Sequence, residues 1–259
     1  DDNTFGTQIL FQKKHNNNGI TIYLDNLTTI DSVNYCNIIL LIANNNEYHK
    51  SIAQIQLDKF NHINFTTIIV NGIRHTNFYY NGKHTSVIQE GSLSLSEKLS
   101  DDFLKSDAFI GNGSSHTIPR NTTLNITKTS GLKGYIDEFR FFVNSRTKKD
   151  IVEEKNNNIY ATNSLNVYYK FNEPSSEYTN NNICLDSSGK KVHGLIRKNN
   201  TTSYNTSQIS SFRSLNSSIA TPLKYELLEK SPIIFPNFSN TLLKQNSLNS
   251  NPIWDKAIG

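Results

Sequence analysis

The stretch Asn64–Val87, NFTTIIVNGIRHTNFYYNGKHTSV, decides the fold. Its runs Asn64–Val70 and Asn77–Tyr80 are rich in β-branched and aromatic residues, which favour strands. Asn81–Gly82 follows the second run directly, and an Asn-Gly pair between two such runs is typical of a tight hairpin turn. The stretch therefore predicts antiparallel strands, the last of them over Thr85–Gln89.

Further short runs of the same kind lie on both sides of this stretch. The turn-forming cluster His15–Gly19 separates the first two of them, which predicts a hairpin. Short strands separated by turn residues favour an antiparallel sandwich. The additional predicted strands are Thr7–Phe11, Ile20–Leu24, Tyr35–Ala43, Ile52–Leu57, Ala108–Gly111 and Tyr135–Val143.

One helix is predicted, over Arg146–Glu154. Thr147 can accept a hydrogen bond at its start, and Asp150 lies at the third helical position, which is the pattern of a capping box. A further strand is predicted within Asn163–Asn172. After Asn199 the chain becomes rich in Ser, Thr and Asn and carries four of its six Pro residues. Residues 199–259 are therefore predicted to form an extended arm or a linker.

The composition excludes several classes of protein. The net charge of +4 is small for 259 residues, so nucleic acid is not an expected partner. The longest apolar run, Ile38–Ala43, is far shorter than the roughly 18 residues that a membrane-spanning helix needs, so no membrane association is expected. With 14 Phe and 12 Tyr the chain can build a core, unlike a disordered protein.

Two cysteines, Cys36 and Cys184, leave the redox state open. They could form one bridge, but secreted disulfide scaffolds carry many more cysteines, so two buried thiols are favoured. No zinc-binding motif is present in the sequence. The 37 Asn residues indicate AT-rich coding, and the lack of any Met suggests an excerpt of, or a processed piece from, a longer polypeptide.

Three parts of the sequence share one pattern. The first is Asn64–Val87, in which a strand turns at a glycine and returns through YYNGK. The second combines FIGN at Phe109–Asn112 with GYIDEFRFF at Gly134–Phe142. The third combines YYKFNE at Tyr168–Glu173 with LDSSG at Leu185–Gly189. Together they resemble the paired strands, the closing segment and the opening segment of the laminin-G-like, or concanavalin-A-like, jelly-roll family.

The closing segment precedes the opening segment in this chain. The resemblance implies an all-β fold: an antiparallel jelly-roll sandwich with one short helix and an extended C-terminal arm. Residues 1–158 would be the later strands of a jelly roll whose opening lies upstream or is absent. Residues 159–198 would be a returning strand or the start of a second jelly-roll unit, and residues 199–259 the arm or linker.

Some members of this family are β-glucanases, in which two glutamates of a Glu-x-Asp-x-x-Glu strand motif act as nucleophile and acid. Aligning Asp137 with the central Asp places Tyr135 and Arg140 at the positions of the glutamates. Neither side chain can act as a carboxylate. The sequence therefore predicts no enzymatic activity and no catalytic residue.

The alternation along the predicted strand separates two faces. Asp137 is expected to be a partly buried carboxylate that backbone donors satisfy, and Glu138 is expected to pair with Arg140. The predicted inward face consists of Tyr135, Asp137, Phe139 and Phe141.

Calcium is the one cofactor that the resemblance raises, because some members of the family bind it through loop carboxylates and carbonyls. It takes six to eight oxygen ligands. Asp25 and Asn26 provide oxygens after a strand, and Asp137 is the third candidate. No spacing of Asp and Asn is diagnostic here, so the sequence favours no bound metal.

Ser231–Pro236, SPIIFP, resembles connectors in large phage baseplate and tail proteins that carry such jelly rolls. The resemblance implies a non-enzymatic structural module of a virion, on a phage tail, baseplate or capsid surface. Its partners would be other virion proteins or copies of itself. The alternative is a carbohydrate-binding or adhesion module with surface glycans as partners. The expected location is the virion, or otherwise the extracellular space or the cell surface.

Overall fold

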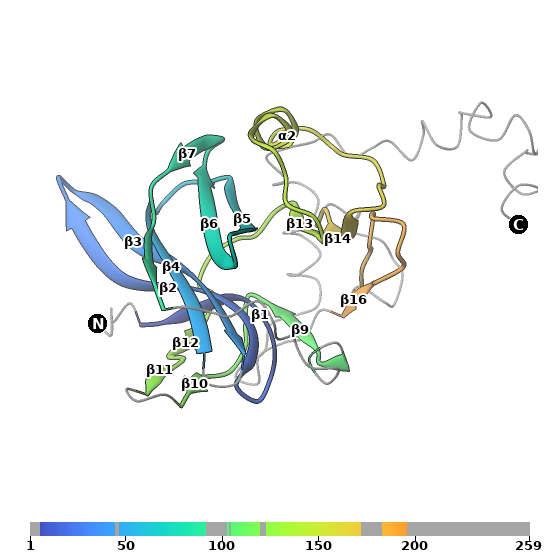
Figure 1. Ribbon diagram of the computed structural model, residues 1–259. Helices are drawn as coiled ribbons and strands as arrows, with labels where there is room; N and C mark the ends of the chain where they lie inside the picture. Colours follow the sequence, from blue (N-terminus) through green and yellow to red (C-terminus); the bar gives the residue numbers. More distant parts are fainter. Residues whose placement is uncertain are drawn as a thin grey trace, which may run out of the picture. The chain divides into compact units, whose positions relative to one another are not determined.

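The computed structural model describes residues 6–44, 47–91, 103, 105–119, 123–171 and 183–195. The predicted arm at 199–259 lies outside the described residues. The described part consists mainly of strands in antiparallel sheets, together with the short helix α2 (Lys148–Glu154) (Figure 1). The all-β prediction is therefore confirmed.

The elements fall into two compact units. The first unit contains residues 1–136 and 141–155, and the second contains residues 137–140 and the chain from residue 156. The strands are β1 (Gln8–His15), β2 (Asn18–Ile30), β3 (Val33–Asn44), β4 (Glu47–Gln56), β5 (Ile63–Val70), β6 (Ile73–Tyr80), β7 (Lys83–Thr85), β8 (Ile88–Glu90), β9 (Ala108–Ile110), β10 (His116–Ile118), β11 (Leu124–Ile126), β12 (Ser130–Gly131), β13 (Phe139–Phe142), β14 (Leu165–Tyr169), β15 (Ile183–Cys184) and β16 (Gly194–Leu195).

The main sheet of the first unit has the strand order β12-β1-β2-β3-β4-β8, and β9 also pairs with β1. Strands β1 to β4 form an antiparallel meander in which each strand pairs with the next one along the chain. The turn between β2 and β3 consists of Asp31 and Ser32, which both have positive φ, as a two-residue hairpin turn of the favoured twist requires. β12 joins the edge of β1 in parallel.

Strand β3 is buried on both of its faces, which explains the uninterrupted apolar run Ile38–Ala43. Its even-numbered side chains pack in clusters that include Phe65 and Phe78 of the three-stranded sheet β5-β6-β7. Its odd-numbered side chains pack with Ile118 and Ile126 of the hairpin β10-β11. A strand covered on both sides has no polar face, so its sequence does not alternate.

Two Asn-Gly turns organise the sheet β5-β6-β7. The predicted turn at Asn81–Gly82 is confirmed and joins β6 to β7. A second pair, Asn71–Gly72, joins β5 to β6, so β6 begins at Ile73 rather than at Asn77. The predicted strand Thr85–Gln89 is divided, because β7 belongs to this sheet and β8 to the main sheet.

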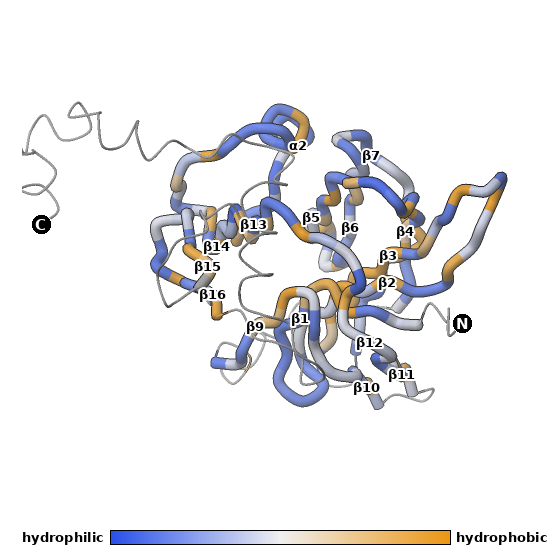
Figure 2. The backbone as a smooth tube through the Cα atoms, turned by 180° about the vertical axis from the view of Figure 1, so that it is seen from behind, coloured by the Kyte–Doolittle hydropathy of each residue, from blue (hydrophilic) through white to orange (hydrophobic). Residues whose placement is uncertain are grey.

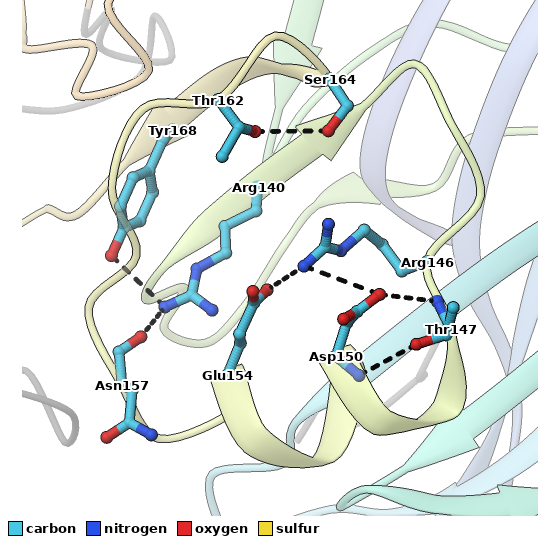
Figure 3. A network of polar contacts seen from close by, with 9 residues as sticks. All are labelled: Arg140, Arg146, Thr147, Asp150, Glu154, Asn157, Thr162, Ser164 and Tyr168. Carbon is cyan, nitrogen blue, oxygen red and sulfur yellow. Dashed lines mark hydrogen bonds and ion pairs between the residues drawn. The ribbon is translucent and has the colours of Figure 1, made fainter.

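The capping box of α2 is confirmed. Thr147 Oγ1 accepts a hydrogen bond from the Asp150 backbone N–H at 3.2 Å, and Asp150 Oδ2 accepts one from the Thr147 N–H at 3.1 Å (Figure 3). Arg146 adds an ion pair with Glu154 at 2.6 Å. The two hydrogen bonds between Thr147 and Asp150 satisfy backbone donors that the first turn of a helix leaves without partners.

The prediction of one long strand over Tyr135–Val143 is wrong. Strand β13 covers Phe139–Phe142 alone, because Glu138 has a φ of 53°, outside the extended region. The alternation cannot run through such a residue. Tyr135 is 67% exposed and does not lie on an inward face.

Candidate functional site

The three calcium candidates do not form a common cluster within one unit. Asp25 and Asn26 lie in the first unit at an irregularity of β2, where Asn26 has a φ of 52° and its N–H donates to Asp25 Oδ1 at 2.9 Å. Asp137 belongs to the second unit. The described residues contain no group of three or more His, Cys, Asp or Glu side chains that could hold a metal ion.

The two cysteines are buried, and neither forms a disulfide. Burial raises the pKa of the Cys36 thiol to about 12, and the charge of Asp25 adds to this effect. A thiol needs to ionise to act as a nucleophile. Cys36 therefore packs as a small apolar side chain, in the core cluster that contains Ile38 and Phe78.

A buried polar cluster lies in the second unit around Glu138. Its side chain is 4% exposed, and its Oε2 accepts hydrogen bonds from Arg140 at 2.9 Å and from the Tyr168 hydroxyl at 2.5 Å. The predicted pair of Glu138 and Arg140 is thus confirmed. Arg140 also donates to the Asn157 carbonyl at 2.6 Å (Figure 3). The buried carboxylate at this position is Glu138, which the sequence reasoning did not expect.

The electrostatics of this cluster keep Tyr168 neutral. Burial and the hydrogen bond to Glu138 raise the pKa of the Tyr168 hydroxyl far above its usual range. The Arg140 guanidinium lies over the ring of Tyr168 at 4.9 Å, and the Lys170 ammonium lies 5.2 Å from the same ring. These contacts hold Glu138 in its positive-φ conformation, which costs energy for a residue with a side chain.

The LDSSG segment forms a loop around one carboxylate. Asp186 Oδ1 accepts from the N–H groups of Tyr168 and Ser188, and Oδ2 accepts from Ser188 Oγ and from the Val192 N–H, all within 3.0 Å. Burial raises the pKa of Asp186, but these hydrogen bonds outweigh it and leave the pKa below its ordinary value. Backbone and hydroxyl donors thus occupy both oxygens, so Asp186 orders the loop.

A second buried network links β1, β2 and β10 in the first unit. Gln12 Nε2 donates to Thr21 Oγ1 at 3.2 Å, Thr21 Oγ1 lies 2.9 Å from His116 Nδ1, and His116 Nε2 lies 3.1 Å from the Asn17 carbonyl. When His116 is neutral with its proton on Nε2, Thr21 Oγ1 donates to His116 Nδ1 and His116 Nε2 donates to the Asn17 carbonyl. Each contact of the network then joins one donor to one acceptor. Burial lowers the pKa of His116, which agrees with the neutral form.

His49 of β4 lies in the layer between the main sheet and β6. Its Nε2 is 2.8 Å from Thr76 Oγ1 and 3.0 Å from Ser51 Oγ, and the residue is 3% exposed. Burial lowers the pKa of His49 to about 4, and the positive charges of Arg74 and His75 contribute. Ser51 is fully buried, so this serine and histidine stabilise the core and do not face a substrate.

The pKa of His49 makes stability depend on pH. Folded His49 stays neutral between about pH 6.5 and 4, whereas the unfolded chain binds a proton there. The contribution of His49 to the free energy of unfolding is complete above pH 6.5 and is lost as pH falls toward 4. We expect this loss to be about 2–3 kcal/mol. Urea unfolding of wild type and His49→Asn at both pH values measures this, and His84→Asn is the surface control. A pH dependence that is equal in wild type and His49→Asn would contradict it.

Apolar side chains are exposed on a projecting part of the main sheet. The pairing of β1 with β2 ends at Leu24, so the outer edge of Asn26–Ile30 pairs with no described strand. Residues 26–34, the β2–β3 ribbon, extend beyond the neighbouring strands (Figure 1). Leu27 is 40% exposed and Ile30 53% exposed, and Figure 2 shows hydrophobic residues between hydrophilic ones along the ribbon.

A second exposed apolar group surrounds the turn between β5 and β6. This apolar hairpin end consists of Ile68, Ile69, Val70 and Ile73, each between 37% and 60% exposed. Three consecutive apolar residues in water are unusual for a strand that is covered on one face. Exposed apolar patches of this kind mark interaction surfaces in soluble proteins.

We compared the chain with models of protein families, with curated proteins and with solved structures, and no match was found. Within the part of the chain that the structure describes, no helix has the length and apolar character needed to cross a membrane. The case for a function therefore depends on the surfaces and clusters described above.

Proposed function

We propose that this chain is a non-enzymatic structural module of a virion that packs on neighbouring subunits, on a phage tail, baseplate or capsid surface. The observation that carries the proposal is the β2–β3 ribbon, which combines an open strand edge with the exposed Leu27 and Ile30. An open edge offers backbone hydrogen bonds to another chain, and apolar side chains add burial. The virion location rests on the resemblance of SPIIFP to phage connectors.

We propose further that the fold is a jelly roll of the laminin-G-like kind. In support, β13 of the closing segment pairs with β14 of the opening segment. This pairing favours residues 159–198 as a returning strand over the start of a separate unit. The ordered LDSSG loop, which is built around Asp186, fits the same proposal.

Self-association tests the proposed packing. The double variant Leu27→Asn with Ile30→Asn should raise the dissociation constant between copies at least tenfold, because it removes two apolar contacts worth about 1 kcal/mol or more each. Val152→Asn, which alters an exposed apolar residue of α2, is the matched control. Sedimentation measures the change.

A monomer at all concentrations, or equal effects of both changes, would contradict packing between copies through the ribbon. The virion location has its own test, because peptides of the chain should be found by mass spectrometry in purified particles. Their absence from particles would contradict that part of the proposal.

One observation favours carbohydrate binding as a second function. Phe60 and Tyr135 form an exposed aromatic pair in the first unit, with ring centroids 6.4 Å apart and exposures of 49% and 67%. Exposed aromatic faces with polar neighbours can stack on sugar rings. Glycan binding that is lost in Tyr135→Ala would favour this function, whereas self-association that depends on the ribbon favours assembly.

A further inference from the structure

The chain contains four Asn-Gly pairs, and the structure describes all of them: Asn18–Gly19, Asn71–Gly72, Asn81–Gly82 and Asn112–Gly113. An asparagine followed by glycine has an intrinsic reactivity, because no side chain hinders the glycine nitrogen from reaching the amide carbon of the asparagine. The reaction needs the backbone to leave its native conformation. Its rate in the folded protein therefore depends on how easily each pair opens locally.

Close packing holds two of the glycines. Gly19 is buried, and a Cβ atom built there would lie 2.3 Å from the Lys13 carbonyl oxygen. At Gly113 such an atom would lie 2.7 Å from Gln12 Oε1. Asn112 Oδ1 also accepts a hydrogen bond from Lys128 Nζ at 2.5 Å. Movement of either pair would disturb contacts of β1.

The pair Asn81–Gly82 is held by its surroundings. Gly82 is buried, and its Cβ position lies 3.1 Å from the Lys155 side chain. Asn81 Oδ1 accepts a hydrogen bond from the His62 N–H at 2.8 Å. The Asn81 carbonyl accepts another from Lys155 Nζ at 3.2 Å. This turn cannot open without the loss of these contacts.

The pair Asn71–Gly72 has the same backbone conformation and none of this support. Its φ angles of 50° and 81° match the 52° and 81° of Asn81 and Gly82. No atom of the residues that the structure describes lies within 4 Å of the Cβ position of Gly72, and both Asn71 and Gly72 are exposed. The hydrogen bonds of the described residues include none from the Asn71 side chain. The two pairs thus differ in surroundings and not in local geometry.

We propose that Asn71 is the position where this chain undergoes spontaneous covalent modification in the folded state. The Gly72 backbone nitrogen attacks the side-chain amide carbon of Asn71, a C–N bond forms, and the amide leaves as ammonia with the proton from Gly72. Water then opens the resulting succinimide at one of its two carbonyls. The product is an aspartate or an isoaspartate, and no oxidant or enzyme is required.

The modification changes the apolar hairpin end. Either product places a carboxylate beside Val70 and Ile73, which are 45% and 60% exposed. Isoaspartate also adds a methylene to the backbone of a two-residue turn, which shifts the pairing of Val70 with Ile73. Modified chains would therefore accumulate with time, and each would carry an added negative charge and local disorder at this surface. This inference does not depend on the proposed function.

The test compares the four pairs within one sample. The intact chain is incubated in mildly alkaline buffer, natively and in denaturant, and peptide mapping by mass spectrometry follows the conversion of each asparagine. In the native sample we expect Asn71 to convert at least tenfold faster than the other three, which corresponds to about 1.4 kcal/mol of opening free energy. In denaturant the four rates should agree within a few-fold.

Asn81 is the matched internal control because it shares the turn conformation of Asn71. Equal rates at Asn71 and Asn81 in the native sample would overturn the proposal. A native ranking that persists unchanged in denaturant would overturn it too, because the sequence and not the structure would then set the rates. Native selectivity for Asn71 that disappears in denaturant supports it.

Discussion

Replacing Glu138 by Ala is expected to lower the free energy of unfolding by about 3–5 kcal/mol. The change removes the acceptor of the hydrogen bonds from Arg140 and Tyr168, and it leaves the Arg140 guanidinium, whose side chain is 11% exposed, without this counter-charge. A buried charge that loses its partner keeps its desolvation cost and loses its compensation. Chemical unfolding monitored by circular dichroism measures the loss.

The chain offers a matched control for this prediction. Glu154→Ala also removes the partner of an arginine, Arg146, but the side chains of that pair are 33% and 19% exposed, so the loss should stay below about 1 kcal/mol. The double variant Glu138→Ala with Arg140→Met removes both buried charges and should recover much of the stability. Equal losses in Glu138→Ala and Glu154→Ala would show that burial does not decide the effect.

Phe78→Ala is expected to cost about 3–5 kcal/mol as well, through lost transfer energy and the cavity that remains. Phe78 is fully buried between the main sheet and the sheet β5-β6-β7, and its ring lies 4.9 Å from that of Phe65. Thermal and denaturant unfolding of the variant measure the cost.

Phe139→Ala is the informative comparison for this second prediction. Phe139 is half-buried, so its truncation should cost less, about 1–3 kcal/mol. An unbroken alternation through Asp137 would have placed Phe139 fully inside and predicted a cost like that of Phe78. A larger loss for Phe139→Ala than for Phe78→Ala would reject the burial pattern of the structure.

The sequence predicts the elements that depend on local chemistry. The turn at Asn81–Gly82 and the capping box of Thr147 and Asp150 are confirmed, because each is determined by a few adjacent residues. The same signal at Asn71–Gly72 is present in the sequence, and its use would have placed the start of β6 correctly. Runs of β-branched and aromatic residues predict that a strand exists, but they do not predict where the strand begins and ends.

The remainder depends on tertiary contacts that no local pattern contains. Glu138 carries a side chain and yet has positive φ, and its ion pair and hydrogen bonds, rather than its own preference, keep it there. Short strands such as β10 and β11 have no sequence pattern of their own. Their pairing is stabilised because Ile118 and Ile126 pack against the odd-numbered side chains of β3. The exposure of Leu27 and Ile30 could not be predicted either, because an apolar residue in a strand usually indicates a core position.

The meander of β1 to β4 has a consequence for the order of folding. Each of its pairings joins neighbouring segments of chain through a short turn, so loop closure costs little entropy. Strand β1 meets β9 and β12 across about a hundred residues or more, as in the pairing of Gln8 with Ser130. We therefore expect strands β1 to β4 to form before β9 and β12 add to the edge of β1. Pulse-labelling hydrogen exchange during refolding would show protection in β2 and β3 before β9.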